Sequence, residues 1–153
     1  MAQKKFPSTY VTSDIVVFHQ NHASERILLI KRKNEPFKGD WALPGGFFDP
    51  QDLNVKACAA RELAEEVSLV RPIEDFKLVG VYSEKNRDPR ENNSQEPCRV
   101  ISIAFMICIE GENAEIKACD DASDWAFFDV TQLPPLAFDH FQIVSDALSL
   151  KRK

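Results

Sequence analysis

One segment constrains the fold of this chain more than any other: a short apolar run that ends at two glycines and is followed by a helical pattern. Residues 41–43 (W-A-L) are typical of a short strand, which ends at Pro44-Gly45-Gly46. Glycines there allow the backbone a positive φ and a close approach to a ligand. The hydrophobic period then changes to that of a helix over residues 53–67. The segment therefore predicts strand, glycine loop and helix in succession.

The predicted helix has two distinct faces at 100° per residue. The apolar positions that share one face are Leu53, Ala57, Ala60, Ala64 and Val67. Because three of them are alanine, we expect this face to lie close against a sheet. Glu62, Glu65 and Glu66 share the opposite face. Asp52 is the expected N-cap.

Three carboxylates on one helical face repel one another unless something offsets their charge. Arg61 can balance part of it through Glu65, four residues on, but one arginine cannot neutralise three glutamates. A divalent cation is the natural compensation, and carboxylate oxygens suit Mg²⁺ or Mn²⁺. The alternative is a solvated acidic face held by surface ion pairs.

The rest of the chain predicts further strands and one more helix around this segment. Strands are expected at residues 11–19 and 26–32, as a hairpin, and at 76–83, 99–110 and 125–130; a helix is expected at 138–150. Residues 84–97 form a long polar loop of a length that is usually functional or disordered. With 153 residues, the chain is expected to form a single domain, 1–153, because one domain holds about 100–200 residues.

Composition excludes several classes of protein. Lys and Arg number 19 and Asp and Glu 24, which gives a net charge of −5, and a pI near 5.2 argues against a general nucleic-acid binder. No apolar run approaches the roughly 20 residues of a membrane helix. The N-terminus lacks the apolar stretch of a signal peptide, so the protein is expected to be cytoplasmic. Four cysteines without a C-x-x-C pair suggest neither a disulfide framework nor a zinc site.

Residues 45–69, G-G-F-F-D-P-Q-D-L-N-V-K-A-C-A-A-R-E-L-A-E-E-V-S-L, resemble the Nudix box, a strand–loop–helix signature that ends in R-E-x-x-E-E. The positions that match are Gly46, Arg61, Glu62, Leu63, Glu65, Glu66 and Leu69. Two departures stand out. Arg61 comes one residue late, with Asp52 the only counterpart of the early box glutamate. Ser68 replaces a glycine, and it must either take the left-handed conformation or end the helix differently.

This resemblance implies both a fold and a reaction. The implied fold is α/β, an α/β/α sandwich around a mixed sheet, and the implied reaction is hydrolysis of a nucleoside diphosphate linked to another group. The implied metal ligands for Mg²⁺, or alternatively Mn²⁺, are Glu62, Glu65 and Glu66, and the implied catalytic residues are Arg61, Glu62 and Glu65. A water held by such a cation loses a proton more readily. The general base stays open, with Glu84, Asp88, Asp120, Asp121 and Asp139 as loop or boundary candidates.

Motifs outside the box resemble one subgroup of the family. W-A-L-P-G-G-F, R-D-P-R at residues 87–90, D-D-A at 120–122 and L-A-F-D-H at 136–140 look like the subgroup of ADP-ribose pyrophosphatase-like enzymes and Nudix modules of NAD metabolism. The residues expected to contact substrate are Gly46, Arg87, Arg90 and Arg99. Regulators in this subgroup carry a DNA-binding domain after the Nudix module, and the sequence stops at Lys153, so no nucleic-acid partner is expected.

ADP-ribose, hydrolysed to AMP and ribose 5-phosphate, is the best single substrate on this resemblance. The alternatives are hydrolysis of a nucleoside triphosphate and a non-catalytic module that senses an ADP-ribose-type ligand. A homodimer is expected by analogy only, and no membrane partner is expected.

Aromatic and histidine residues outside the box have simpler interpretations. Trp41 and Trp125 are expected in the core rather than against a nucleobase. His140 is expected to be a structural hydrogen-bond partner, with Asp139 capping the last helix. His19 and His22 are expected at the surface.

Overall fold

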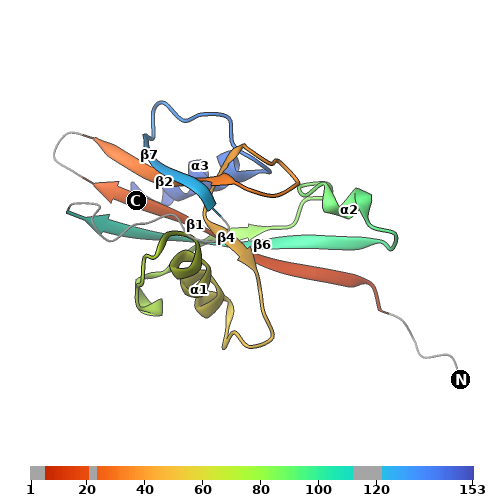
Figure 1. Cartoon of the computed structure of the whole chain (residues 1–153). Helices are drawn as coiled ribbons and strands as arrows, with labels where there is room; N and C mark the ends of the chain where they lie inside the picture. The colour runs from red at the N-terminus through yellow and green to blue at the C-terminus, as the bar shows by residue number, and fades with distance from the viewer. Residues whose placement is uncertain (1–5, 21–23, 112–121) are drawn as a thin grey trace, which may run out of the picture.

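A seven-stranded mixed sheet forms the centre of the structure, a computed structural model that describes residues 6–20, 24–111 and 122–153 (Figure 1). Its strand order is β3-β2-β1-β6-β5, with β4 paired to β1 and β7 paired to β2. The strands are β1 (Ser8–Gln20), β2 (Glu25–Arg32), β3 (Trp41–Ala42), β4 (Gly45–Phe47), β5 (Lys77–Tyr82), β6 (Cys98–Glu110) and β7 (Ala122–Asp129). The helices are α1 (Val55–Val67), α2 (Arg90–Asn93) and α3 (His140–Lys151), with a 3₁₀ turn at Ile73–Asp75.

The longest strands, β1 and β6, are also the only parallel pair of strands in the described sheet, and they run side by side from Ser8↔Cys98 to Gln20↔Glu110. The other pairings are antiparallel. The predicted hairpin is confirmed, because Phe18 of β1 lies opposite Ile27 of β2. The short helix α2 interrupts the predicted long loop between β5 and β6.

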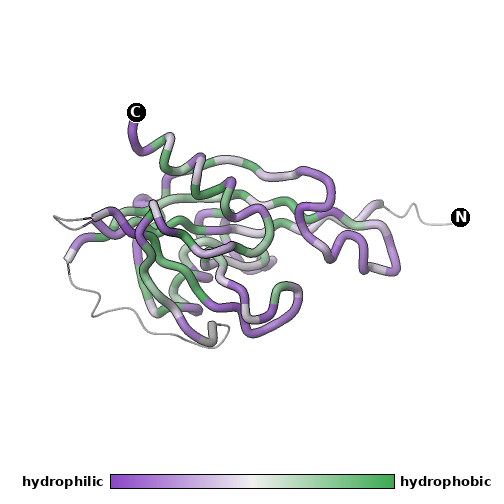
Figure 2. The backbone as a smooth tube through the Cα atoms, turned by 90° about the horizontal axis from the view of Figure 1, so that it is seen from above, coloured by the Kyte–Doolittle hydropathy of each residue, from purple (hydrophilic) through white to green (hydrophobic). Residues whose placement is uncertain are grey.

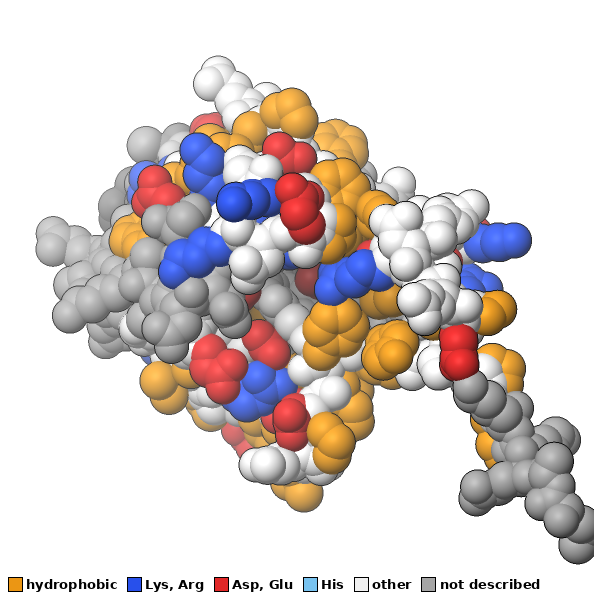
Figure 3. All heavy atoms as spheres, turned by 45° about the vertical axis from the view of Figure 1, so that its right-hand side comes forward, with side chains coloured by type: hydrophobic (Ala, Val, Ile, Leu, Met, Phe, Trp, Pro, Cys, Tyr) orange, Lys and Arg blue, Asp and Glu red, His pale blue; other side chains and the backbone are white. Residues whose placement is uncertain are grey.

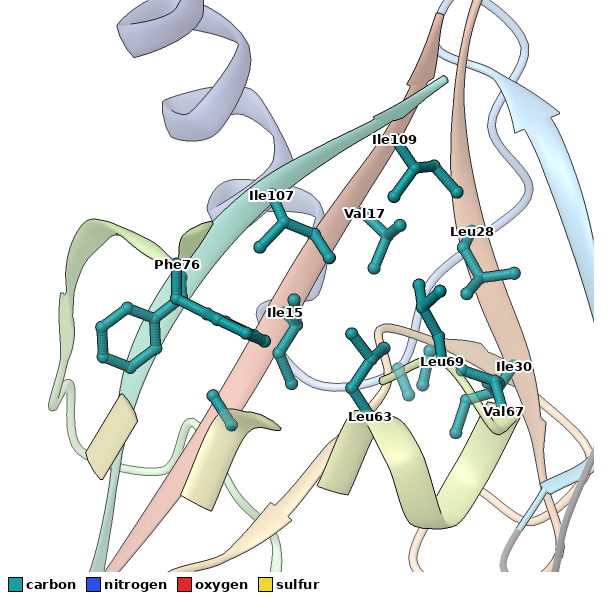
Figure 4. Packing of buried hydrophobic residues seen from close by; sticks show 14 residues of the cluster. Ile15, Val17, Leu28, Ile30, Leu63, Val67, Leu69, Phe76, Ile107 and Ile109 are labelled. Carbon is teal, nitrogen blue, oxygen red and sulfur yellow. The ribbon is translucent and has the colours of Figure 1, made fainter. Parts of the chain in front are cut away.

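Both faces of the sheet are buried, because alternate residues of a strand point to opposite faces. On one face Ile15 and Val17 of β1 pack with Leu63 and Val67 of α1, and their side chains point toward each other in Figure 4. On the other face Val16 packs with Ile143 and Val144 of α3. Figure 2 shows hydrophobic residues along these central strands and hydrophilic ones in the loops. The predicted α/β/α sandwich is therefore confirmed.

The start of α1 differs from the prediction. Asn54, not Asp52, is the N-cap, and its side chain accepts a hydrogen bond from the backbone N–H of Ala57 at 3.0 Å. Leu53 precedes the helix and is 86% exposed. Asp52 is drawn away from the helix start because its carboxylate binds Arg61.

The orientation of α1 also differs from the prediction. Its buried residues are Cys58, Ala59, Glu62, Leu63, Glu66 and Val67, so two glutamates face inward and the predicted Ala57, Ala60 and Ala64 face is only half-buried. The larger side chain of Leu63 favours this orientation, because burying it gains more than burying an alanine, whereas Val67 is buried as predicted. Ser68 ends the helix in the left-handed conformation, with φ 58°, as one of the two predicted outcomes.

The outcomes for the C-terminal helix and the histidines are mixed. α3 begins at His140, and Asp139 makes no side-chain capping bond. His19 was expected at the surface, yet it is 3% exposed and bonds the carbonyl of Gly111; His22 lies outside the described residues. Trp41 and Trp125 pack against the two cores, as predicted. Within residues 6–20, 24–111 and 122–153, no helix is long and apolar enough to cross a membrane.

Candidate active site

A pocket of about 340 Å³ lies where β1, β4 and α1 meet. Its wall is built from the two predicted glycines. Gly45 and Gly46 of β4 pair with Asp14 and Ser13 of β1. A Cβ on Gly45 would lie 2.2 Å from the carbonyl oxygen of Ser13, and one on Gly46 would lie 2.4 Å from the carboxylate carbon of Glu62. Both positions therefore need glycine for close approach, as the sequence indicated.

Glu62 and Glu66 of α1 are buried and line this pocket. The backbone N–H of Gly45 donates to Oε2 of Glu66 at 2.9 Å. Gly46 lies directly against the carboxylate of Glu62. The glycine strand thus orients both carboxylates, and this explains how two acidic side chains can be buried on the inner face of a helix.

Glu65 takes a different position from the other two glutamates. Its side chain is 55% exposed and bonds the Nη1 of Arg61 at 3.1 Å, as the i, i+4 spacing predicted. It is absent from the pocket lining, whereas Glu62, which also binds Arg61 at 2.8 Å, is part of it. The structure therefore places two of the three glutamates in the pocket and the third at its outer side.

Arg61 is the centre of a charged cluster beside the pocket. Its Nε and Nη2 donate to the two oxygens of Asp52, both at 2.8 Å, and Nη2 also donates to the carbonyl of Phe47 at 3.0 Å. Hydrogen bonding to Asp52, and then to Glu62, raises the pKa of Arg61. In turn, the hydrogen bond from Arg61 lowers the pKa of Asp52 to about 2. Asp52 thus joins the loop before α1 to Arg61.

This ion pair predicts a measurable acid sensitivity. The pKa of Asp52 is depressed from 3.8 to about 2 in the folded protein, so the pair contributes stability that is fully present above pH 4 and is lost as the pH falls toward 2. Asp52→Asn is expected to lower the Tm at pH 7, and the gap between the two proteins is expected to narrow from pH 4 downward. Thermal unfolding measured by circular dichroism between pH 3 and pH 7 checks this, and a gap independent of pH would contradict it.

Two observations bear on whether these residues can hold a metal ion. Among the residues that the structure describes, no three His, Cys, Asp or Glu side chains come together as a metal site. However, Mg²⁺ in proteins is usually held by one or two carboxylates, with waters and substrate phosphates completing its shell. Glu62 and Glu66, side by side in the pocket, provide such a pair of hard oxygen donors.

The sequence-predicted arginines separate into two groups. Arg87 and Arg90 line the pocket. Arg87 is buried and donates two hydrogen bonds to Asp139, from Nε to Oδ2 at 2.8 Å and from Nη2 to Oδ1 at 2.6 Å. Arg99 is not part of the lining, and instead forms an ion pair with Glu91 at 3.5 Å. The structure thus brings two of the three arginines to the site.

Arg90 lines the pocket and contacts two aromatic rings. Its guanidinium carbon is 4.8 Å from the ring centre of Phe47 and 5.6 Å from that of Phe138. Its Nε binds Asp88 at 3.0 Å. Cation–π contacts and the ion pair hold the guanidinium beside both rings, which leaves a cationic and aromatic surface in this part of the pocket.

The candidates for the general base are also sorted by the structure. Asp88 is 1% exposed and lines the pocket, whereas Glu84 is exposed and lies outside the lining, and Asp139 holds Arg87. Asp120 and Asp121 lie outside the described residues. Burial raises the pKa of the Cys58 thiol, beside Gly46, to about 11, so that thiol stays protonated and is no nucleophile at neutral pH.

Sequence reasoning missed several residues that line the pocket, among them Asp14, Arg32 and Lys33. Asp14 carried one signal, as the single acid in the otherwise apolar and hydroxylated run V-T-S-D-I-V-V-F. Figure 3 shows that on one face of the molecule basic and acidic side chains lie next to one another. The net negative charge is therefore not concentrated in one patch on that face.

A second, more open pocket of about 710 Å³ adjoins the first and shares Phe47 and Arg90 with it. It lies along the first residues of β1 and β6. Tyr10, which is 50% exposed, meets Phe47 edge to face at 6.1 Å between ring centres. The aromatic end of the site thus continues onto the surface.

Comparison with known proteins places this geometry in context. The chain is 46% identical over 126 residues to an ADP-ribose pyrophosphatase of Methanocaldococcus jannaschii, a match that covers 82% of this chain and 68% of that protein. It is 34% identical over 145 residues to the ADPR responsive transcriptional repressor NtrR of Acinetobacter baylyi, covering 94% of this chain but only 55% of the repressor.

A solved structure with a similar fold is that of a bifunctional NMN adenylyltransferase/ADP ribose pyrophosphatase from Francisella tularensis, complexed with AMP and a Mn ion. Its TM-score is 0.79 at 26% identity, covering 96% of this chain and 43% of that one. Residues 9–147 of the chain match the NUDIX domain. A match over most of the chain, together with a relative 46% identical to it, shows that this chain belongs to the NUDIX domain family.

Proposed function

We propose that this chain is a Mg²⁺-dependent Nudix pyrophosphohydrolase that cleaves ADP-ribose to AMP and ribose 5-phosphate. The observation that carries the proposal is the pocket itself, which is lined by two buried carboxylates, Glu62 and Glu66, and by the cationic residues Arg32 and Arg90. A pyrophosphate needs both. Basic groups attract its oxygens directly, and carboxylates bind it only through a cation. The similarity to an ADP-ribose pyrophosphatase supports the choice of substrate.

The metal is proposed to be held by Glu62 and Glu66. Glu65, which directly precedes Glu66 on α1, is the third carboxylate of the box. When bound, the cation neutralises charge on the phosphates and makes water easier to deprotonate. Mn²⁺ is the expected substitute, in keeping with the ion in the Francisella structure. Glu62 and Glu66 are fixed by Gly46 and Gly45, so their positions are set before any ligand arrives.

The chain's own residues divide the remaining work. Arg61 bridges Glu62 and Glu65 through its Nη1 and neutralises part of their charge. Gly46 leaves room at the pocket wall, and Arg90, which lines the pocket, is proposed to contact the phosphates or the adjoining ribose. Arg87 also lines the pocket, and its charge is paired with the carboxylate of Asp139. Asp88 is the proposed general base among the described candidates, because it alone is both buried and in the lining.

A substrate panel tests this function directly. ADP-ribose, other nucleoside diphosphate sugars and nucleoside triphosphates are incubated with Mg²⁺ or with chelator, and the products are identified by chromatography. Release of AMP and ribose 5-phosphate, abolished by chelator, is the expected result. Release of inorganic pyrophosphate from a triphosphate would instead establish triphosphate hydrolysis.

A ligand sensor is the second candidate function, and the similarity to an ADPR responsive repressor is the observation that favours it. A sensor would bind ADP-ribose, raising Tm, without turnover. The metal-directed glutamates argue for the enzyme, since a sensor does not require a pair of buried carboxylates beside the phosphates. No turnover of any panel compound, with ligand-dependent stabilisation, would select the sensor.

Arg90→Ala tests the proposed phosphate contact. Loss of one charge-assisted hydrogen bond, worth about 1.5–3 kcal/mol, is expected to raise KM for ADP-ribose by about tenfold or more. Steady-state kinetics measures this. Arg152→Ala is the matched control, because Arg152 is exposed at the end of α3 and is absent from the pocket lining. An unchanged KM in Arg90→Ala would remove Arg90 from the substrate site.

The wider setting is proposed on the same basis. The chain is taken to work as a single domain, 1–153, in the cytoplasm, with a small nucleotide as its partner and no nucleic acid or membrane. A homodimer is proposed by analogy. Arg99 is retained as a substrate contact only if Arg99→Ala raises KM, since it lies outside the pocket lining.

A further inference from the structure

His140, the first residue of α3, is buried in the pocket wall with both ring nitrogens engaged. Its side chain is 4% exposed. The backbone N–H of Leu43 donates to Nδ1 at 3.0 Å, so Nδ1 carries no proton. The proton of the neutral ring is therefore on Nε2, which faces Oδ1 of Asp14 at 3.4 Å. With its one lone pair already used by Leu43, His140 is not placed to act as a general base.

The partner of His140 belongs to the segment that orients the carboxylates. Leu43 is followed by Pro44, which has no N–H, and then by Gly45, whose N–H holds Glu66. The carbonyl of Pro44 accepts a hydrogen bond from the N–H of Ile15 at 2.9 Å. One residue, Pro44, thus separates the bond to His140 from the bond to Glu66, and the carbonyl of Pro44 joins this turn to β1.

The same stretch of chain is held at a second point just before His140. The N–H of Ala137 donates to the carbonyl of Trp41 at 2.9 Å. The residues just before and at the start of α3 therefore bond the W-A-L-P-G-G segment at two points, Trp41 and Leu43. Leu43 and His140 are 97 residues apart in the sequence. Within the described residues, Nδ1 of His140 is the side-chain acceptor for the Leu43 N–H.

We propose that His140 is a positioning residue, which fixes the Leu43–Gly46 segment through the acceptor on Nδ1 and thereby sets the Glu66 carboxylate for the cation. This rests on the proposed function for its catalytic consequence, though not for its structural one. The contact of Nε2 with Asp14 orients the ring. The bond from Leu43 to Nδ1 is the one that fixes the segment leading to Gly45 and so to Glu66.

Two substitutions separate the two ring nitrogens. In His140→Asn the amide oxygen can take the place of Nδ1 and accept from Leu43, whereas the contact to Asp14 is lost. In His140→Gln the amide nitrogen can take the place of Nε2 and donate to Asp14, whereas the acceptor for Leu43 is lost. The two variants therefore remove one bond each from the same buried site.

Three readouts are measured on the full chain: steady-state kinetics with ADP-ribose, Mn²⁺ binding by calorimetry without substrate, and amide hydrogen exchange of Leu43 and Gly45 by NMR. His140→Gln is expected to lower kcat about tenfold or more with KM within about threefold, to weaken Mn²⁺ binding about 10- to 100-fold, and to speed exchange at both amides. In His140→Asn, kcat, Mn²⁺ affinity and amide exchange are expected to stay close to the wild-type values.

Tyr82→Phe is the matched control. It removes a hydrogen bond of 2.7 Å from Tyr82 to Asp146, which also joins α3 to the sheet but lies outside the pocket lining. A loss of stability alone would affect Tyr82→Phe and His140→Gln alike, whereas only His140→Gln is expected to change exchange at Leu43.

Equal impairment of the Asn and Gln variants, or a Gln variant with wild-type exchange and Mn²⁺ affinity, would overturn the proposal. If wild type fails to hydrolyse any substrate, the proposed function fails, while Mn²⁺ affinity and amide exchange still decide the role of His140.

Discussion

Glu66→Gln is expected to reduce kcat by about 100-fold or more while the fold stays intact, which is the order of loss when a positioned catalytic group is removed. Glutamine has the same shape as glutamate, and its amide oxygen can still accept the hydrogen bond from Gly45 that holds Glu66 in place. What it lacks is the negative charge that a cation needs. Activity and stability should therefore separate cleanly in this variant.

Purified wild type and variant are compared by kcat at saturating Mg²⁺ and by Tm. Glu74→Gln is the matched control, since Glu74 is an exposed acid outside the pocket lining. Glu65→Gln is expected to lower kcat less than Glu66→Gln, because its carboxylate is half exposed and faces Arg61 rather than the pocket. Near-wild-type turnover in a Glu65→Gln/Glu66→Gln double variant would remove the assignment of these glutamates altogether.

The strands and the identity of the site segment could be predicted because both depend on local pattern. Runs of β-branched residues indicate β1 and β6, and the glycine pair is recognisable from the local sequence alone. The orientation of α1 could not be read in the same way. Periodicity predicts an alanine face and an acidic face. Burial of Glu62 and Glu66 depends instead on tertiary contacts: Gly45 donates a hydrogen bond to Glu66, Gly46 leaves space for the carboxylate of Glu62, and Arg61 pairs with its charge.

The arrangement of the basic residues was hidden for the same reason. Arg87 meets Asp139 across 52 positions of sequence. Nothing local distinguishes Arg87 from Arg99, yet the first is buried in the pocket wall and the second is drawn to Glu91 outside the lining. The motif L-A-F-D-H pointed to the right stretch of chain, but whether Asp139 capped the helix or clamped an arginine could be decided only by the fold.

Gly46→Ala is expected to abolish most of the activity by moving Glu62. The new Cβ would stand 2.4 Å from the carboxylate carbon of Glu62 and equally close to its two oxygens, closer than any real Cβ contact. To relieve this contact the Glu62 carboxylate has to turn away from Gly46, and that movement disrupts its ion pair with Arg61. We expect kcat to fall about 100-fold, comparable to removing a catalytic group, and the free energy of unfolding to drop by about 1–3 kcal/mol, the usual cost of overpacking.

Gly80→Ala is the control for inserting a methyl group on a strand glycine, because its Cβ would meet only the ring of Tyr82 at 3.5 Å, an ordinary contact. A second variant tests the cause. Glu62→Asp retracts the carboxylate by one methylene, so Gly46→Ala should destabilise a Glu62→Asp protein less than it destabilises wild type. Equal destabilisation in both backgrounds, measured by urea unfolding, would show that the methyl group is accommodated elsewhere and that Gly46 does not set the position of Glu62.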